Sequence, residues 1–336
     1  MKAVGFTRYL PVTDPESFLD IELPEPTPTG HDILVHVRAV AVNPVDTKVR
    51  APKDKIEESP RIIGYDAAGI VTAVGSDVTL FKTGDEVFYA GDITRSGTNQ
   101  EFHLVDERIV GRKPKSLSFA EAAALPLTAI TAYESFFHRL KIDPHGSDAG
   151  KSILIIGGAG GVGSIGIQLA KHAGLQVITT ASRPETISWV RELGADHVIN
   201  HRQPLIAQMA ALGFDYVDYI AIFNDMRHWN DAVELIRPQG AIVTIDDTNL
   251  PMPMERMKTK AASLHWELMF TRAMFKTPDM VEQHKLLSFI ADEIDAGRLR
   301  TTLSEILSPI NAANLREAHR RIETGTAKGK IVLEGF

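Results

Sequence analysis

A glycine-rich turn between an apolar run and a helical pattern is the feature that most constrains this chain. The segment 158–163 has the spacing G-x-G-x-x-G, and the apolar run Ser152–Ile156 leads directly into it. Glycines permit a tight turn and a close approach of backbone to a pyrophosphate, and the next helix N-terminus offers unpaired N–H groups. The pattern predicts a strand, turn and helix that bind a dinucleotide. The predicted pyrophosphate contacts are Gly158, Gly160, Gly161, Val162 and Gly163. A tight turn with only a structural role is the alternative.

Bulk composition narrows the classes of partner. The chain has 336 residues, a formal net charge of −7, a pI near 6.0 and no long basic run. These values fit two domains and argue against nucleic acid or an anionic membrane as the main partner. The N-terminus resembles a strand more than a signal peptide, and no apolar run reaches about 18 residues. The lack of cysteine excludes disulfides, thiolate catalysis and thiolate metal ligands. We expect a cytoplasmic protein.

The first 115 residues are rich in strand patterns. Three strands are predicted at Ile33–Val42, Gly69–Gly75 and Asp85–Ala90, with Gly, Pro and Asp clusters between them. Short strands at this spacing indicate a barrel-like antiparallel domain. The proline-rich segment 23–30 and the segment 50–60 are expected to be loops, the latter at the substrate pocket.

The pattern changes near residue 118. Ser118 and Glu121 have the spacing of a capping box, and a second helix is expected from Pro126 to Arg139. Strands and helices then alternate, which predicts a doubly wound parallel sheet between about residues 122 and 262. The expected strands are 152–156, 176–180, 197–199, 216–223 and 240–245, and the expected helices are 162–173, 184–193 and 229–236. Amphipathic helices near 279–296 and 311–323 and a strand at 329–334 are expected to follow.

The end of the second strand of such a sheet selects the nicotinamide cofactor. An acidic residue there favours the free ribose 2′-hydroxyl of NAD, but this strand is followed by Ser182 and Arg183. An arginine can bind a 2′-phosphate through charge and paired hydrogen bonds, so the sequence favours NADP(H). Alternatively, Arg183 is a solvated residue at a helix start and Ser182 a helix cap. Glu185 would weaken the preference if it turned inward. His201 is expected beside the adenine or the phosphate, or on the surface.

The chain resembles the medium-chain dehydrogenase/reductase superfamily, and within it the quinone oxidoreductase-like branch. The resemblance spans nearly the whole chain. Besides the glycine turn, its carriers are Asn43-Pro44-Val45-Asp46, Gly64-Tyr65-Asp66-Ala67-Ala68-Gly69, Gly84-Asp85-Glu86-Val87, the segment Ala122–Tyr133, the segment Leu193–Asn200, and Gly329-Lys330-Ile331-Val332-Leu333.

This resemblance implies an α/β architecture with two domains. A GroES-like, β-rich catalytic domain would span 1–121 and be completed by 263–336, and a Rossmann NADP(H)-binding domain with a doubly wound parallel sheet would span 122–262. The active site would lie in the cleft between them. The family also implies a homodimer, with a seam at Ala241–Ile245 or the segment after it.

A subgroup with close resemblance is often labelled zinc-type alcohol dehydrogenase. In zinc-dependent members a cysteine, a histidine and a cysteine stand at the positions that match Asn43, Tyr65 and Leu127 here. Tetrahedral zinc requires thiolate, imidazole or carboxylate ligands that converge on one point. Asp46 and Asp66 without a histidine make a poor zinc site, so we expect no metal.

Without zinc, hydrogen-bond donors or cations must polarise the oxygen of the hydride acceptor. The predicted catalytic residues are Asn43, Lys48 and Tyr65, although Lys48 could be a solvated surface residue and Tyr65 a packing residue. The resemblance also implies a set of residues near the cofactor, each of which could instead pack or cap. That set is Thr128, Thr131, Phe223, Asn224, Ile245, Asp246 and Lys330.

The leading hypothesis is a zinc-independent, NADPH-dependent oxidoreductase. It would transfer hydride to a small electrophilic molecule, a quinone or an α,β-unsaturated carbonyl compound. Two alternatives stay open: a zinc-type alcohol dehydrogenase, and a non-catalytic protein that senses NADPH.

Overall fold

The computed structural model describes residues 1–224, 226–249, 251–325 and 327–336, which form two compact units. Unit 1 comprises Met1–Ile130 and Phe270–Phe336, and unit 2 comprises Thr131–Met269. Both breaks lie C-terminal to the domain boundaries expected from the sequence. Unit 1 is the β-rich half and unit 2 carries the parallel sheet, so the predicted α/β class is confirmed.

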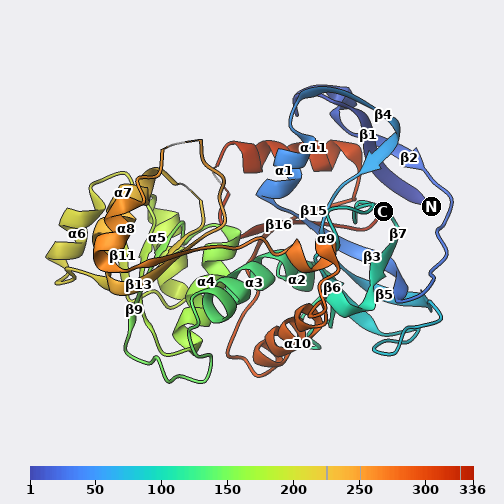
Figure 1. The fold of residues 1–336 in the computed structure, drawn as a ribbon. Helices are drawn as coiled ribbons and strands as arrows, with labels where there is room; N and C mark the ends of the chain where they lie inside the picture. Colours follow the sequence, from blue (N-terminus) through green and yellow to red (C-terminus); the bar gives the residue numbers. More distant parts are fainter. Residues whose placement is uncertain (225, 250, 326) are drawn as a thin grey trace. The chain divides into compact units, whose positions relative to one another are not determined.

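Unit 1 contains two sheets (Figure 1). The smaller sheet has the order β2-β1-β4, and the larger has the order β15-β16-β3-β5-β6-β8, with β7 also paired to β3. The strands are β1 (Lys2–Tyr9), β2 (Leu19–Glu22), β3 (Asp32–Val42), β4 (Lys53–Ile62), β5 (Asp66–Val74), β6 (Glu86–Tyr89), β7 (Phe102–Asp106), β8 (Val110–Arg112), β15 (Leu303–Leu307) and β16 (Lys330–Glu334).

The C-terminal strand β16 lies inside the larger sheet, between β15 and β3. It pairs antiparallel with β3, where Val332 lies opposite Ala41, and parallel with β15. The apolar side chains of β3 and β16 are buried in one core with those of β1 and β5. The helices of this unit are α1 (Pro44–Arg50), α2 (Phe119–Ala123), α9 (Thr271–Phe275), α10 (Glu282–Asp295) and α11 (Ala312–Glu323), with the first residues of α3 (Pro126–Tyr133) and the 3₁₀ turns Pro15–Ser17 and Glu107–Ile109.

One loop prediction in unit 1 is wrong. The segment 50–60 contains most of β4, whose backbone pairs antiparallel with β1 through Tyr9↔Lys53 and Gly5↔Ile62. Most β4 side chains are exposed, so the strand lacks the alternation of apolar and polar residues on which the prediction depends. Its pairing arises from the neighbouring backbone, with register shifts where it passes Arg8.

Unit 2 is a six-stranded parallel sheet with the order β11-β10-β9-β12-β13-β14. This is the strand order of a dinucleotide-binding fold, with β9 as the first strand and a switch point between β9 and β12. The strands are β9 (Ser152–Ile156), β10 (Gln176–Thr180), β11 (His197–Ile199), β12 (Val217–Ile222), β13 (Ile236–Thr244) and β14 (Ser263–Trp266). Every residue of β9 is buried, which explains its continuous apolar run.

Three helices of unit 2 agree closely with the predicted ones: α4 (Gly161–His172), α5 (Pro184–Glu192) and α7 (Trp229–Leu235). The sequence analysis does not predict α6 (Leu205–Ala211), α8 (Glu255–Lys260) or the 3₁₀ turn at Met226–His228. The predicted helix from Pro126 to Arg139 needs one correction, because its α-helical part, α3, ends at Tyr133 and a π-helical turn covers Glu134–Arg139.

Two further predictions concern local details. The capping box is confirmed: the Glu121 N–H donates to Ser118 Oγ at 3.2 Å, and the Ser118 N–H donates to Glu121 Oε2 at 2.8 Å.

One of the two places expected for a dimer seam, Ala241–Ile245, is wrong because β13 is paired on both sides, by β12 and by β14. The edge strand of this sheet is β14, which lies in the segment after Ala241–Ile245, the other expected place for the seam. Within the described ranges, no helix is long and apolar enough to cross a membrane.

Candidate functional site

The carboxyl edge of the unit 2 sheet gathers most of the predicted cofactor residues. The glycine turn follows β9, Ser182 and Arg183 follow β10, and His201 follows β11. Phe223 and Asn224 follow β12, and Ile245 and Asp246 follow β13. Parallel strands end at the same edge, and ligands of open α/β sheets bind there beside the switch point. The sheet order therefore brings residues from five strand ends to one edge of the unit 2 sheet.

The glycine turn is packed too closely for side chains. A Cβ at Gly158 would overlap the hydroxyl oxygen of Thr179 on β10, and a Cβ at Gly163 would overlap the Gly157 carbonyl. The N–H of Gly157, whose φ is +96°, donates to Thr180 Oγ1 at 2.9 Å. α4 begins at Gly161, so its N-terminal N–H groups lie beside the turn. This cradle is of the kind that a pyrophosphate requires.

The tip of β10 carries a side-chain ion pair. Arg183 Nε lies 2.6 Å from Glu185 Oε1, and the Arg183 N–H donates to Thr186 Oγ1 at 3.2 Å at the start of α5. Ser182 and His201 are half-buried. The guanidinium expected to meet a 2′-phosphate is thus held by a carboxylate within this protein.

The residues after β12 and β13 differ in their surroundings. Phe223 is buried, and its ring lies 5.9 Å from that of Phe136 between ring centroids. The exposed Asn224 has its side chain against Gly157, the residue before the glycine turn. Ile245 and Asp246 are half-buried, and the Ile245 N–H donates to the Ile222 carbonyl at 3.4 Å.

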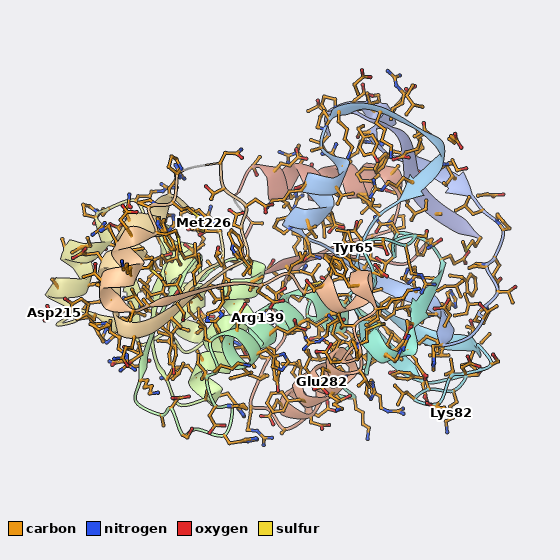
Figure 2. The ribbon with its side chains drawn as sticks, in the orientation of Figure 1. Tyr65, Lys82, Arg139, Asp215, Met226 and Glu282 are labelled. Atoms are coloured by element: carbon orange, nitrogen blue, oxygen red, sulfur yellow. The ribbon has the colours of Figure 1, made fainter. Side chains whose placement is uncertain are left out.

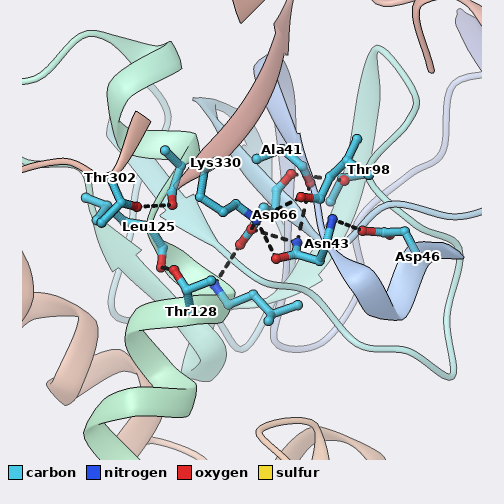
Figure 3. Close-up of polar contacts among 12 residues, drawn as sticks. Ala41, Asn43, Asp46, Asp66, Thr98, Leu125, Thr128, Thr302 and Lys330 are labelled. Carbon is cyan, nitrogen blue, oxygen red and sulfur yellow. Dashed lines mark hydrogen bonds and ion pairs between the residues drawn. The ribbon is translucent and has the colours of Figure 1, made fainter. Parts of the chain in front are cut away.

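Unit 1 holds a buried polar cluster of Asn43, Asp66 and Lys330, which we call the Lys330 cluster (Figure 3). Lys330 Nζ donates to Asn43 Oδ1, to Asp66 Oδ2 at 2.9 Å and to the Val42 carbonyl at 3.1 Å. Asn43 Nδ2 donates to Asp66 Oδ2 at 2.8 Å. The three side chains are at most 3 % exposed, so the ammonium and the carboxylate neutralise each other in the protein interior.

Two backbone groups extend the Lys330 cluster. The Leu127 N–H donates to Asp66 Oδ1 at 2.6 Å, and the Asn43 N–H donates to Asp46 Oδ2 at 2.6 Å. Asp46 lies in the first turn of α1, as the partner of Asn43 in a capping box. Burial raises the pKa of Asp46 to about 7, against the opposing effects of the Asn43 N–H and of Lys330. A proton on Asp46 near neutral pH avoids a second negative charge beside Asp66.

The other predicted residues of unit 1 lie around or outside this cluster. Tyr65, labelled in Figure 2, is buried with its ring edge-to-face against Phe270 at 5.0 Å, and burial raises the pKa of its phenol, which therefore stays neutral. Thr128, on α3, donates to the carbonyl of Leu125, the residue before that helix, at 3.0 Å. Lys48 is exposed on α1, so the structure does not place it in the cluster. Thr131 is buried and belongs to unit 2.

The positions at which the family resemblance implies zinc ligands do not form a metal site. Lys330 holds the Asn43 oxygen, Tyr65 is a neutral phenol and Leu127 has no donor atom. Both Asp66 oxygens accept hydrogen bonds from the protein. Among the residues that the structure describes, no group of three His, Cys, Asp or Glu side chains is placed to hold a metal ion. Zinc thus does not fit this site.

Sequence reasoning missed two relationships at these sites. It placed Lys330 near the cofactor, but it did not predict the hydrogen bonds of its ammonium to Asn43 and Asp66, which lie 287 and 264 residues away in the chain. A contact over such a separation leaves no periodic signal. It also passed over Thr180, although threonines at the end of a strand beside a glycine turn were visible in the sequence.

Two protein families match separate parts of the chain. Residues 29–132 match the alcohol dehydrogenase GroES-like domain, and residues 193–333 match the zinc-binding dehydrogenase family. The second family is named for zinc binding, but the positions at which the family resemblance implies zinc ligands, Asn43, Tyr65 and Leu127, lie outside residues 193–333.

Relatives with similarity over most of the chain carry several functional names. A zinc-type alcohol dehydrogenase-like protein of Staphylococcus aureus strain Mu50 is 44% identical over 99% of both chains. The NADPH-dependent alkenal/one oxidoreductase of Arabidopsis thaliana chloroplasts is 32% identical over 90% of this chain and 71% of its own.

Two solved structures share the entire fold. One, from Rhizobium etli CFN 42, has a name that assigns it to the zinc-dependent alcohol dehydrogenases; it is 58% identical, with a TM-score of 0.95, over 100% of this chain and 98% of its own. The quinone oxidoreductase of Coxiella burnetii is 26% identical with a TM-score of 0.83, over 100% of this chain and 99% of its own. The chain therefore belongs to the medium-chain dehydrogenase/reductase superfamily of oxidoreductases, in its quinone oxidoreductase-like branch.

Proposed function

We propose that this protein is a zinc-independent, NADPH-dependent reductase of quinones or α,β-unsaturated carbonyl compounds. The observation that carries the proposal is the Lys330 cluster, in which an ammonium holds the Asn43 oxygen and Asp66 where zinc-dependent relatives have a metal site. A chain without metal ligands requires an acceptor that is already electron-poor. Quinones and enones meet that requirement, whereas simple ketones and alcohols do not.

The carboxyl edge of unit 2 is the proposed NADP(H) site. NADPH supplies a hydride when bound. The glycine turn and the first N–H groups of α4 would hold its pyrophosphate, and Ser182 and Arg183 its 2′-phosphate. The printed name of the Arabidopsis relative supports the choice of NADPH. The residues of this edge otherwise serve to orient the cofactor and keep water out.

Asn43 is the proposed hydrogen-bond donor to the acceptor oxygen. A lysine ammonium can only donate, so the amide oxygen of Asn43 must face Lys330 and its Nδ2 must face Asp66. Within the described part of the chain, the second N–H of that group makes only a long contact of 3.5 Å with the Ala41 carbonyl. Because Asn43 is 1 % exposed, an acceptor can reach it only after the side chains that cover it move. Lys48 and Tyr65 remain proposed as secondary donors.

The reaction can be tested with purified protein, NADPH and a panel of acceptors. A quinone and an enone should be reduced, and a simple ketone should not. Zinc measured by mass spectrometry should be far below one atom per chain, and a chelator should leave the rate unchanged. Stoichiometric zinc with chelator-sensitive alcohol oxidation would favour the zinc-type dehydrogenase. Tight NADPH binding without turnover of any acceptor would favour the sensor.

The role of Asn43 needs a separate test. Asn43→Ala should lower kcat for enone reduction by about 100-fold, the usual effect of removing one donor to a developing oxyanion. Thr302→Val is the matched control, since Thr302 is buried and its hydroxyl donates to the Ala124 carbonyl at 3.2 Å. Equal losses in the two variants would assign Asn43 a structural role.

We also propose a homodimer that extends the unit 2 sheet through β14. The outer edge of β14 is unpaired within the described residues, and Trp266 and Leu268 are exposed at its end. A mass measurement by light scattering tests this. A dimer that Trp266→Glu converts to monomer supports the seam, and a wild-type monomer contradicts it.

A further inference from the structure

The ion pair between Arg183 and Glu185 has a consequence for cofactor choice. Arg183 is the cap residue at the start of α5, and Glu185 lies in the first turn of that helix. Arg183 Nε lies 2.6 Å from Glu185 Oε1, with 28% of the Arg183 side chain and 54% of the Glu185 side chain exposed. The pair is therefore open to solvent and to a ligand at the carboxyl edge of the sheet.

A guanidinium binds carboxylates and phosphates with the same N–H donors. While Glu185 lies beside Arg183, its carboxylate offsets the positive charge that a ribose 2′-phosphate would meet. The helix N-terminus further stabilises the negative charge of Glu185 through the helix dipole. A bound 2′-phosphate, which carries up to two negative charges, would have to share Arg183 with that carboxylate or displace it.

We propose that Glu185 is a specificity-determining residue that competes with the 2′-phosphate of NADP(H) for Arg183 and so narrows the preference for NADPH over NADH. The inference rests on the proposed NADP(H) site. NADH has no 2′-phosphate, so the competition does not affect it. Exposed ion pairs contribute at most about 1 kcal/mol, which corresponds to roughly a fivefold change in affinity.

The test compares two charge-neutralising variants on one helix. Glu185→Gln removes the competing charge. Glu192→Gln removes an equally negative, exposed side chain from the other end of α5, where Glu192 accepts a hydrogen bond from Ser188 Oγ at 3.1 Å. Dissociation constants for NADPH and NADH are measured by nicotinamide fluorescence. We expect Glu185→Gln to lower the Kd for NADPH about three- to fivefold and to leave the Kd for NADH unchanged. Glu192→Gln should change neither.

A third variant separates this inference from the proposed function. Arg183→Met should weaken NADPH binding about tenfold and abolish the effect of Glu185→Gln in the double variant. If Arg183→Met weakens NADPH binding but Glu185→Gln behaves like Glu192→Gln, the inference is overturned and the cofactor site stands. If Arg183→Met leaves NADPH binding unchanged, both the assignment of Arg183 to the 2′-phosphate and the inference are overturned.

Discussion

The hydroxyl oxygen of Thr180 accepts a hydrogen bond from the N–H of Gly157 at 2.9 Å, and so ties the end of β10 to the glycine turn. Thr180 is 1 % exposed, so water cannot replace the bond without opening the sheet edge. The contact fixes the peptide that precedes the proposed pyrophosphate cradle. The turn is thus ordered before any ligand binds, which lowers the entropy that binding must overcome.

Thr180→Val should therefore raise the Kd for NADPH about tenfold. Valine keeps the shape of threonine but leaves the Gly157 N–H without its acceptor, and an unmet buried N–H costs about 1–3 kcal/mol. Fluorescence titration measures the Kd. Ser152→Ala, which removes a hydroxyl from the opposite end of β9, is the control. Equal effects of the two variants would show that Thr180 has no special role in binding.

Gly158→Ala should abolish tight NADPH binding, because the new Cβ would overlap the Thr179 hydroxyl oxygen. The double variant Gly158→Ala/Thr179→Ala removes the overlapping oxygen and should recover part of the affinity. Calorimetric titration of each variant with NADPH gives the comparison. A fully active Gly158→Ala protein would contradict the close packing of the turn on β10.

Lys330→Met should destabilise the protein by about 3–5 kcal/mol, the usual loss when one partner of a buried ion pair is removed. Asp66 would then be left as a buried charge without its cation. Neutralising it in the double variant Lys330→Met/Asp66→Asn should restore part of the loss. Urea unfolding monitored by fluorescence measures these changes, and an additive loss in the double variant would argue against the ion pair.

Asp46 predicts a specific dependence of stability on pH. Burial raises its pKa from 3.8 to about 7, so the folded protein binds the proton more tightly than the unfolded chain. Its favourable contribution is complete below pH 4 and is lost as the pH rises through about 7, a total of about 4 kcal/mol. Asp46→Asn removes this titration while keeping an acceptor for the Asn43 N–H.

The free energy of unfolding of Asp46→Asn should therefore lie closer to that of the wild type near pH 5 than near pH 8. Near pH 8, Asp46→Asn should be the more stable protein. Urea unfolding at both values measures the difference. Asp77→Asn, a change of an exposed carboxylate, controls for the general effect of net charge. A stability difference that is the same at both pH values would show that Asp46 does not hold a proton.

Most of unit 2 was predictable because its strands are buried. Ser152–Ile156 and its neighbours need apolar side chains on both faces, and the glycine turn needs its spacing, so the requirements of the fold are visible in the residues. The edge strand β4 was not predictable, since exposed side chains such as Ile56 and Glu58 can vary without loss of packing. A local sequence pattern identifies strands whose side chains are buried, but it misses a strand that is held mainly by backbone pairing.

The candidate site was predictable to a smaller extent. Asn43 and the residues at the strand ends could be named from motifs, but their partners could not. Lys330 gave no sign in the sequence that its ammonium meets Asp66. Glu185 lies two residues from Arg183, but this closeness in the chain did not show whether the two side chains pair. Such pairings depend on side-chain directions that the tertiary structure determines.

The position of β16 in the larger sheet also bears on how the protein is made. Unit 2 is a continuous stretch, Thr131–Met269, whereas unit 1 needs its last strand, Lys330–Glu334, to pair with β3. During synthesis, all strands of unit 2 leave the ribosome before β16 does, and domains generally fold as they emerge. The nascent chain therefore carries β3 with an open edge and Asp66 without its cation until β16 has emerged, so unit 1 is completed after unit 2.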